Sequence, residues 1–347
     1  MRRYRSEGRP TLAHGRARSL LGWTLACVVV LSAANAQNQP EKPAVVDALG
    51  PPPAWAYAVD PPAGPPEARK QLENDAPRHI PGSRAAFTLA QTSDLYGAVD
   101  WHPGEHPAMP EVVAHGRKPD VFACGFCHLP NGQGRPENAG LAGLPAAYIT
   151  RQMADFRQGR RRASEPRQRP IQYMIGVASN TNDEEVRAAA EYFASLKPKP
   201  WIRVVETKTV PKTRVSGWML VAAAGREPIG GRIIEVAVDY HQTELRNDDS
   251  GFIAYVPVGS LAKGKVLVTT GGGKAIPCSV CHSSDLRGKN DVPSIAGRSP
   301  SYMVRQLYDI RSGTRAGINT AQMKPIVGKL TLDDMVSIAA YTGSLPP

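Results

Sequence analysis

Two short cysteine motifs hold the residues of this 347-residue sequence best suited to chemistry. In each motif two cysteines lie three positions apart and a histidine follows the second. The residues are Cys124, Cys127 and His128, and Cys278, Cys281 and His282. On one helical turn, two such cysteines can each form a thioether to a haem vinyl group, and the histidine can give a nitrogen to the iron. The motifs therefore predict two covalent haem c groups, each with iron.

Other uses of paired cysteines compete with haem. A structural zinc site usually has its two CxxC pairs about 15–20 residues apart, whereas these pairs lie about 150 apart. A thioredoxin-like redox pair needs a βαβ pattern and no histidine after the second cysteine. Four cysteines also allow three disulfide connectivities. The histidine directly after each pair favours haem attachment.

An internal repeat surrounds the two motifs. An offset of 154 positions aligns the motifs and also aligns Leu141–Gly159 with Ile295–Gly313. After Gly159 the offset falls to 149, because the first half has five extra residues before Met174. At that offset Met174 coincides with Met323. A thioether can bind haem iron opposite a histidine, so Met174 and Met323 are the predicted second axial ligands.

Three other methionines align with apolar residues of the other half and are predicted to fill the core: Met153, Met303 and Met335. His241 is a weaker alternative to a methionine ligand. His79, His102 and His106, in Pro- and Gly-rich surroundings, are weak ligand candidates as well.

Apolar residues recur at i, i+4 and i+7 in both repeats, which predicts helices. The residues are Ile149, Met153 and Phe156, and Met303, Leu307 and Ile310. Gly159 and Gly313 can end these helices, and capping boxes at 182–185 and 331–334 open the last helix of each half. The predicted fold is all-α, in two tandem haem domains of about 90 residues whose small cores a buried haem would enlarge.

The N-terminus predicts export. Residues 2–18 hold six arginines and one glutamate, and an apolar run from Leu20 to Ala34 precedes a small-residue site ending at Ala36. This is the pattern of a signal peptide cleaved after Ala36, and the run is shorter than the roughly 20 residues of a membrane span. A retained anchor, or lipidation at Cys27, is the alternative. We expect a periplasmic protein with membrane contact only through partners.

The remaining segments differ in composition. Nine prolines between residues 37 and 66 predict an extended arm. Alternation from Ile233 to Tyr240, with strand-like runs at 201–205 and 252–258, predicts a small β-rich insert that serves as a spacer or as a docking surface. The predicted division is a signal peptide (1–36), a Pro-rich arm (37–107), a first haem domain (108–198), the insert (199–257) and a second haem domain (258–347).

The motifs together resemble class I cytochromes c, and two in tandem are similar to dihaem cytochromes of the c-four type. The shared features are CxxCH, a YxxRQ helix, a loop methionine and a last helix ending AxYxxSL. The resemblance covers about half the chain, 111–197 and 258–345. It implies His/Met-ligated haems and electron transfer. In that family a proline carbonyl often orients the histidine; Pro293 matches this position, and Ala139 stands there in the first half.

The predicted function is therefore to carry single electrons between redox proteins, without catalysis or a small-molecule substrate. A periplasmic dehydrogenase or a terminal oxidase is the kind of partner expected, and nucleic acid is not. Two alternatives stay open: a cytochrome subunit of a dehydrogenase complex, and a dihaem peroxidase with one open iron. An arginine-rich loop at 160–169 is a candidate surface for an acidic partner. Candidate propionate contacts are Tyr148, Arg151, Tyr302 and Arg305.

Overall fold

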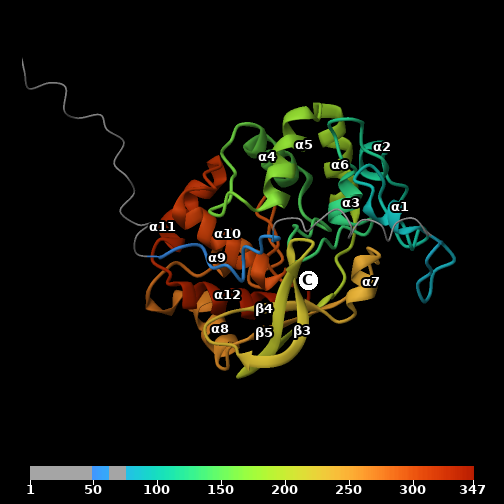
Figure 1. Ribbon diagram of the computed structural model, residues 1–347. Helices are drawn as coiled ribbons and strands as arrows, with labels where there is room; N and C mark the ends of the chain where they lie inside the picture. Colours follow the sequence, from blue (N-terminus) through green and yellow to red (C-terminus); the bar gives the residue numbers. More distant parts are fainter. Residues whose placement is uncertain (1–48, 62–75) are drawn as a thin grey trace, which may run out of the picture. The chain divides into compact units, whose positions relative to one another are not determined.

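The computed structural model of the chain describes residues 49–61 and 76–347 (Figure 1). The predicted signal segment, Cys27 and part of the Pro-rich arm lie outside these residues. Within the described ranges, no helix combines the length and the apolar composition that a membrane span requires.

Helices dominate the first repeat. Short helices come first: α1 (Leu89–Ser93), α2 (Glu111–Ala114) and α3 (Cys124–His128). Longer ones follow: α4 (Ala146–Arg157), α5 (Arg169–Asn180) and α6 (Asp183–Ser195). The capping box that the sequence predicts at Asn182 and Glu185 is present at the start of α6.

The second repeat has corresponding helices. They are α8 (Ser260–Thr270), η2 (Gly271–Gly273), α9 (Ser279–His282), α10 (Pro300–Ser312), η3 (Ile318–Gln322), α11 (Lys324–Val327) and α12 (Leu332–Gly343). Gly313 ends α10 in the left-handed conformation that glycine adopts readily, as the sequence predicts. The capping box at Thr331 and Asp334 is also confirmed.

Strands of the described residues lie between the two repeats; those at 202–206, 234–237 and 252–256 overlap the predicted runs, whereas the two at 209–228 were not predicted. The strands are β1 (Ile202–Glu206), β2 (Thr209–Ser216), β3 (Met219–Pro228), β4 (Ile234–Ala237) and β5 (Phe252–Val256). β5 is central in a three-stranded sheet, parallel to β1 and antiparallel to β4, while β2 and β3 form a hairpin. A short helix, α7 (Tyr240–Glu244), lies between β4 and β5.

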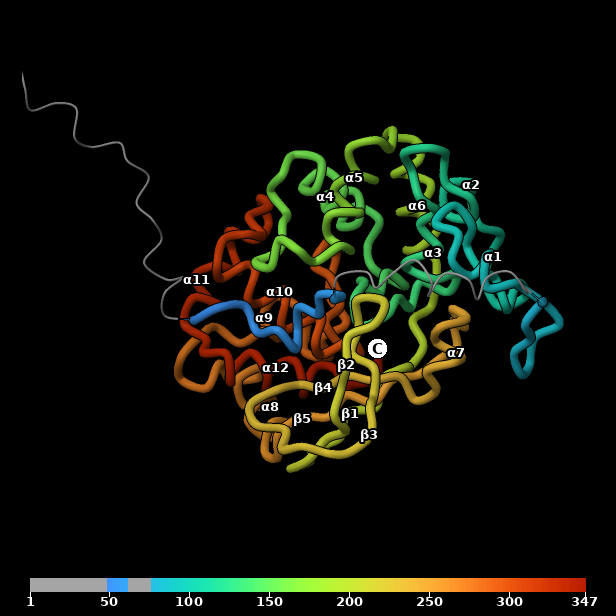
Figure 2. The backbone as a smooth tube through the Cα atoms, viewed as in Figure 1, coloured from blue at the N-terminus to red at the C-terminus, as the bar shows by residue number. Residues whose placement is uncertain are grey.

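The sheet shares its buried core with the second repeat. Ile233, Ala254 and Val256 belong to the same apolar cluster as residues of α8, α10 and α12. The segment 49–61 joins this cluster through Ala56 and Tyr57, and its tube runs beside α10 (Figure 2). The Tyr57 hydroxyl donates to Asp309 Oδ1 at 2.6 Å, which ties this part of the arm to α10.

The two repeats meet through a nearly two-fold set of contacts. Arg161 and Arg315, which are 154 positions apart, pair in an antiparallel β-bridge. Each guanidinium donates at 2.9 Å to the glutamine of its own repeat, and at 2.9–3.0 Å to the tyrosine of the other. The four acceptors are Gln152 and Gln306, and Tyr148 and Tyr302. The repeat seen in the sequence is therefore also a repeat in space.

Candidate haem sites

Both CxxCH motifs form one turn of helix. The first is α3 itself, whereas in the second Cys278 is the N-cap of α9 and already has helical dihedral angles. Helical geometry brings residues three apart onto one face, so both cysteines of a motif can point the same way. The histidine ends the turn in each case.

Each histidine is buried and held by one hydrogen bond from its ring to a main-chain carbonyl. His128 Nδ1 lies 2.8 Å from the Ala139 oxygen, and His282 Nδ1 lies 2.8 Å from the Pro293 oxygen. The carbonyl contact that the resemblance implies at Pro293 is thus present, and Ala139 supplies the same contact in the first repeat. A carbonyl on Nδ1 fixes the tautomer and leaves the Nε2 lone pair for a metal.

Burial keeps these side chains neutral. It lowers the pKa of His128 to about 4, despite the opposing hydrogen bond to Ala139, and it also lowers the pKa of His282. Burial raises the pKa of Cys124 to about 12 and that of Cys278 to about 11. A neutral imidazole is the form that binds iron.

The structure argues against the competing uses of the cysteines. All four described cysteines are free thiols. The two cysteines of each motif share a helical turn but form no disulfide with each other. In the described ranges, the cysteines and histidines of the two motifs do not come together as three ligands around one point. The disulfide and zinc alternatives have no geometric support, and the free thiols and free Nε2 atoms fit covalent haem.

The two predicted methionine ligands lie on different local structures. Met323 follows η3 and begins α11, close to the loop position that the sequence predicts. Met174 lies inside α5 rather than before a helix, which differs from the prediction. Pro170 at the first turn of α5 explains the early start of this helix.

Both methionines are half-buried. The ring of Tyr173, next to Met174, meets Phe122 edge to face at 5.4 Å, and Phe122 precedes Cys124 by two residues. Met323 and Cys278 pack against the same apolar cluster. These placements are compatible with the predicted axial roles.

The other polar candidates have partners within the protein. Tyr148 and Tyr302 bind the arginines that join the repeats, Arg151 pairs with Asp291 at 2.9 Å, and Arg305 is buried with Nη1 2.7 Å from the Ala56 oxygen. The arginine-rich loop at 160–169 is mostly paired: Arg160 with Asp155, Arg167 with Glu165, and Arg161 at the repeat interface. Arg162 and Arg169 of this loop are exposed and pair with no carboxylate of the described residues.

Histidines outside the motifs are also engaged or exposed. His102 Nε2 lies 3.3 Å from Asn247 Oδ1, and His106 Nε2 lies 3.2 Å from Asp100 Oδ1. His79 and His241 are exposed.

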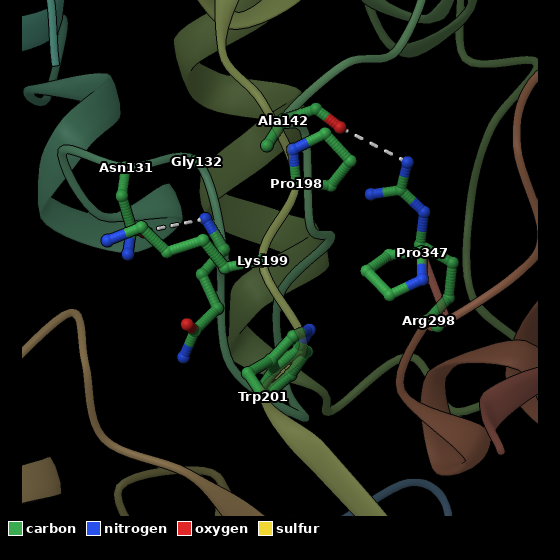
Figure 3. Close-up of a pocket in the computed structure, with 10 residues that line it drawn as sticks. Asn131, Gly132, Ala142, Pro198, Lys199, Trp201, Arg298 and Pro347 are labelled. Carbon is green, nitrogen blue, oxygen red and sulfur yellow. Dashed lines mark hydrogen bonds between the residues drawn. The ribbon is translucent and has the colours of Figure 1, made fainter. Parts of the chain in front are cut away.

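A small cavity lies between the loop after the first motif and the second repeat (Figure 3). It measures about 20 Å³ and is lined in part by Asn131, Lys199, Trp201 and Arg298. Arg298 crosses to the first repeat, where Nη2 donates to the Ala142 oxygen at 3.2 Å (Figure 3). A space of this size holds about one water molecule.

One contact at the first motif could not be predicted from the internal repeat of the sequence. Arg246, from the segment after α7, lies over the ring of Phe126 inside the first motif. The insert has no counterpart in the other half, so the repeat could not reveal it. Arg161 and Arg315, by contrast, lie two positions beyond the aligned Gly159 and Gly313, so continuing the 154 offset would have paired them.

Comparisons with known proteins agree with this geometry. The family model of cytochrome c matches residues 113–197. Cytochrome c4 from Stutzerimonas stutzeri is 36% identical over 235 residues, which cover 65% of this chain and 85% of that protein. The chain belongs to the cytochrome c4 family.

Two further comparisons describe the relatives. A thiosulfate dehydrogenase electron acceptor from Thiomonas intermedia is 24% identical over 235 residues, covering 66% of this chain and 81% of that protein. The solved cytochrome c4 of Acidithiobacillus ferrooxidans superposes with a TM-score of 0.42 and 22% identity, covering 64% of this chain and 98% of that one. As a cytochrome c4-like class I cytochrome, the chain takes part in electron transfer and binds haem c covalently.

Proposed function

We propose that this chain is an exported dihaem electron carrier. Cys124 and Cys127 attach one haem c in the first repeat, and Cys278 and Cys281 attach another in the second. His128 and His282 give the first axial nitrogen of each site. The observation that supports this most directly is the duplicated contact from a buried histidine ring to a carbonyl at 2.8 Å.

Met174 and Met323 complete the two axial pairs in this proposal. When bound, each haem supplies an iron that gains and loses one electron. The protein's part is to hold Nε2 of each histidine in place through Nδ1 and to keep water from the site by burial. A histidine and a methionine would hold each haem, which suits electron transfer rather than substrate binding.

Redox proteins are the proposed partners, and the periplasm is the proposed compartment. A relative named as an electron acceptor of thiosulfate dehydrogenase supports a dehydrogenase as one donor. The predicted signal segment supports export. The domain division into two haem domains and an insert, as given from the sequence, belongs to the same proposal.

Optical spectroscopy of the haem-loaded protein tests the ligands. Met174→Ala is expected to remove about half of the ferric methionine–iron absorption band and to let one reduced haem bind carbon monoxide. Met323→Ala is expected to do the same for the other haem. Met153→Leu is the control, because Met153 aligns with Leu307 in the repeat.

Other outcomes would contradict the proposal in distinct ways. A wild-type protein with one haem that binds carbon monoxide would have an open iron and would be a peroxidase candidate. A chain that matures with fewer than two covalent haems would contradict the dihaem assignment.

A further inference from the structure

The two CxxCH motifs differ in what covers them. At the first motif Phe126 is 2% exposed, and the guanidinium carbon of Arg246 lies 3.4 Å from the centre of its ring. Arg246 also donates to the main-chain oxygens of Phe126 and Thr92, both at 2.8 Å. Thr92 belongs to α1, so one buried arginine joins the insert and the N-terminal arm over the motif.

We call these two segments the cap: residues 89–101, which include α1, and residues 240–250, which include α7. Trp101 Nε1 donates to the Leu245 oxygen at 2.8 Å, which joins the two halves of the cap. Gln133 Nε2 donates to the Ser250 oxygen at 2.9 Å, which fixes the cap to the loop after the motif. In Figure 1, α7 lies near α1 and α3, on the side of the molecule away from α9.

Among the described residues, no segment covers the second motif as the cap covers the first. Val280 holds the position of Phe126 in the repeat and is 67% exposed. Cys281 is exposed, and Ile276, four residues before Val280, is 55% exposed. We call Ile276, Val280 and Cys281 the second-motif face. Cys281 is one of the two cysteines proposed to attach the second haem, so this face borders the proposed attachment point.

The segment of sequence that carries this face is rich in basic residues. Residues 258–291 contain five basic side chains (Lys263, Lys265, Lys274, Arg287 and Lys289) and two acidic ones (Asp285 and Asp291). Lys263 and Lys274 form ion pairs with Asp334. Lys265 and Lys289 are exposed, and no carboxylate of the described residues pairs with either of them. An apolar centre with a basic rim suits an acidic protein, because rim charges steer the encounter and apolar contact holds it.

We infer that the second-motif face is the docking surface for an acidic redox protein, and that electrons are exchanged with that partner through the second repeat. This inference rests on the proposed function. In each encounter one electron passes between the partner and the second repeat, so one is oxidised by one electron as the other is reduced. The cap covers the corresponding surface of the first repeat and so prevents a partner from binding there.

Binding to an acidic probe tests the face without electron transfer. Oxidised flavodoxin, an acidic flavoprotein, is titrated against the oxidised full chain at low salt, and the Kd is measured by NMR. Val280→Glu is expected to raise the Kd about tenfold or more, because it places a like charge at the centre of the contact. Lys289→Glu is a second variant, expected to raise the Kd and to weaken its dependence on salt.

Val238→Glu is the matched control, since Val238 is 64% exposed and lies in the insert. Its Kd is expected to stay within about twofold of wild type, because the added charge lies outside the contact. Reduction by flavodoxin hydroquinone is measured as a second readout, with V280E slower than V238E.

Three results would overturn the inference. Wild type could fail to bind flavodoxin at low salt, or V238E could weaken binding as much as V280E. Dimerisation of the chain in sedimentation that V280E abolishes would assign the face to a second copy instead. A chain without covalent haem would contradict the proposed function, and the binding titration would still report on the face separately.

Discussion

At the scale of single residues, the turn after each CxxCH motif decides where the histidine points. Leu129 and Ser283, the residues that follow the two histidines, have φ of 62° and 67°. A non-glycine residue in this left-handed region costs about 1–2 kcal/mol. The turn lets Gly134 and Gly288 donate to the histidine carbonyls at 2.9 and 3.0 Å. The chain then returns past the imidazole to offer the carbonyl of residue 139 or 293.

Gly288→Ala tests this loop. Gly288 has φ of +82°, and a Cβ there would lie 2.4 Å from the Val292 oxygen, next to the Pro293 carbonyl that holds His282. We expect a loss of about 2–4 kcal/mol in the free energy of unfolding, from backbone strain together with crowding. Urea unfolding of the haem-loaded protein measures it.

Gly273→Ala is the control, because Gly273 also has positive φ (+71°) but nothing lies within 4 Å of an added Cβ. It carries the backbone strain alone, so its loss is expected to be near 1 kcal/mol. Equal losses in the two variants would mean that the close approach to Val292 has no energetic weight.

At this scale the sequence predicted the cysteines and histidines and also the positions of the orienting carbonyls. The spacing CxxCH is short and fixed by one helical turn, so no distant contact is needed to predict it. The contact of Arg246 with Phe126 could not be predicted, because it depends on a fold that brings these two distant positions together.

At the scale of elements, the first turn of α12 contains an acidic residue, Asp334, that both caps the helix and pairs with two lysines. Asp334 is fully buried, accepts from the Thr331 main chain at 3.0 Å as part of the capping box, and pairs with Lys263 and Lys274 at 2.7 and 2.9 Å. Burial alone would raise its pKa, but the two lysines and the cap outweigh burial and lower it. The ionised form is therefore stabilised by folding.

Asp334→Asn is expected to lower the free energy of unfolding by about 2 kcal/mol at pH 7. A lowered pKa contributes stability above the unfolded value of about 4, and this contribution is lost as the pH falls through the folded pKa. The difference between wild type and variant should therefore shrink below about pH 4. Denaturant unfolding between pH 2.5 and 7 measures it.

Asp333→Asn is the matched control, because the neighbouring Asp333 is exposed and pairs only with Lys263. Its effect is expected to stay below about 0.5 kcal/mol. A difference between D334N and wild type that persists unchanged at low pH would contradict the assigned ionisation.

Helix ends marked by capping boxes were predictable because the signal is local, as Asn182 and Thr331 illustrate. The extent of the helix before the second motif was harder to predict, because Gly271–Gly273 interrupt the sequence there, and Gly271 does end α8. Gly264, inside α8, instead allows this helix to approach α12, where a Cβ would clash with the Ser337 oxygen. A glycine that serves packing and one that breaks a helix look alike in sequence.

At the scale of the whole molecule, segments far apart in sequence share one core. Tyr57 of the arm, Val256 of β5 and Met335 of α12 belong to a single apolar cluster. Composition predicted an extended arm and a β-rich insert, but it could not predict that both would contribute buried residues. Whether these residues are buried depends on contacts between positions far apart in the sequence, such as Tyr57 and Asp309, which are 252 positions apart.

The paired arginines make a final prediction at this scale. Arg161→Ala would leave the Tyr302 hydroxyl without its arginine donor and would leave Arg315 as the remaining donor to Gln152. Arg315→Ala would do the same to Tyr148 and Gln306. We expect each variant to lower the free energy of unfolding by about 1–3 kcal/mol. Arg162→Ala is the control, because Arg162 is exposed and its guanidinium binds only the Gly159 oxygen of its own loop.

The double variant separates a shared network from two independent contacts. Gln152 accepts from both arginines, at 2.9 and 3.0 Å, and Gln306 accepts from both at 3.3 and 2.9 Å. Once one arginine is gone, each glutamine oxygen still accepts from the other, and only the second substitution leaves both oxygens without an arginine donor. R161A/R315A should therefore destabilise by more than the sum of the single variants. Strict additivity, or an equal loss in R162A, would mean that the repeats are held by their apolar contacts. A loss greater than additive would make this two-fold network the link between the repeats.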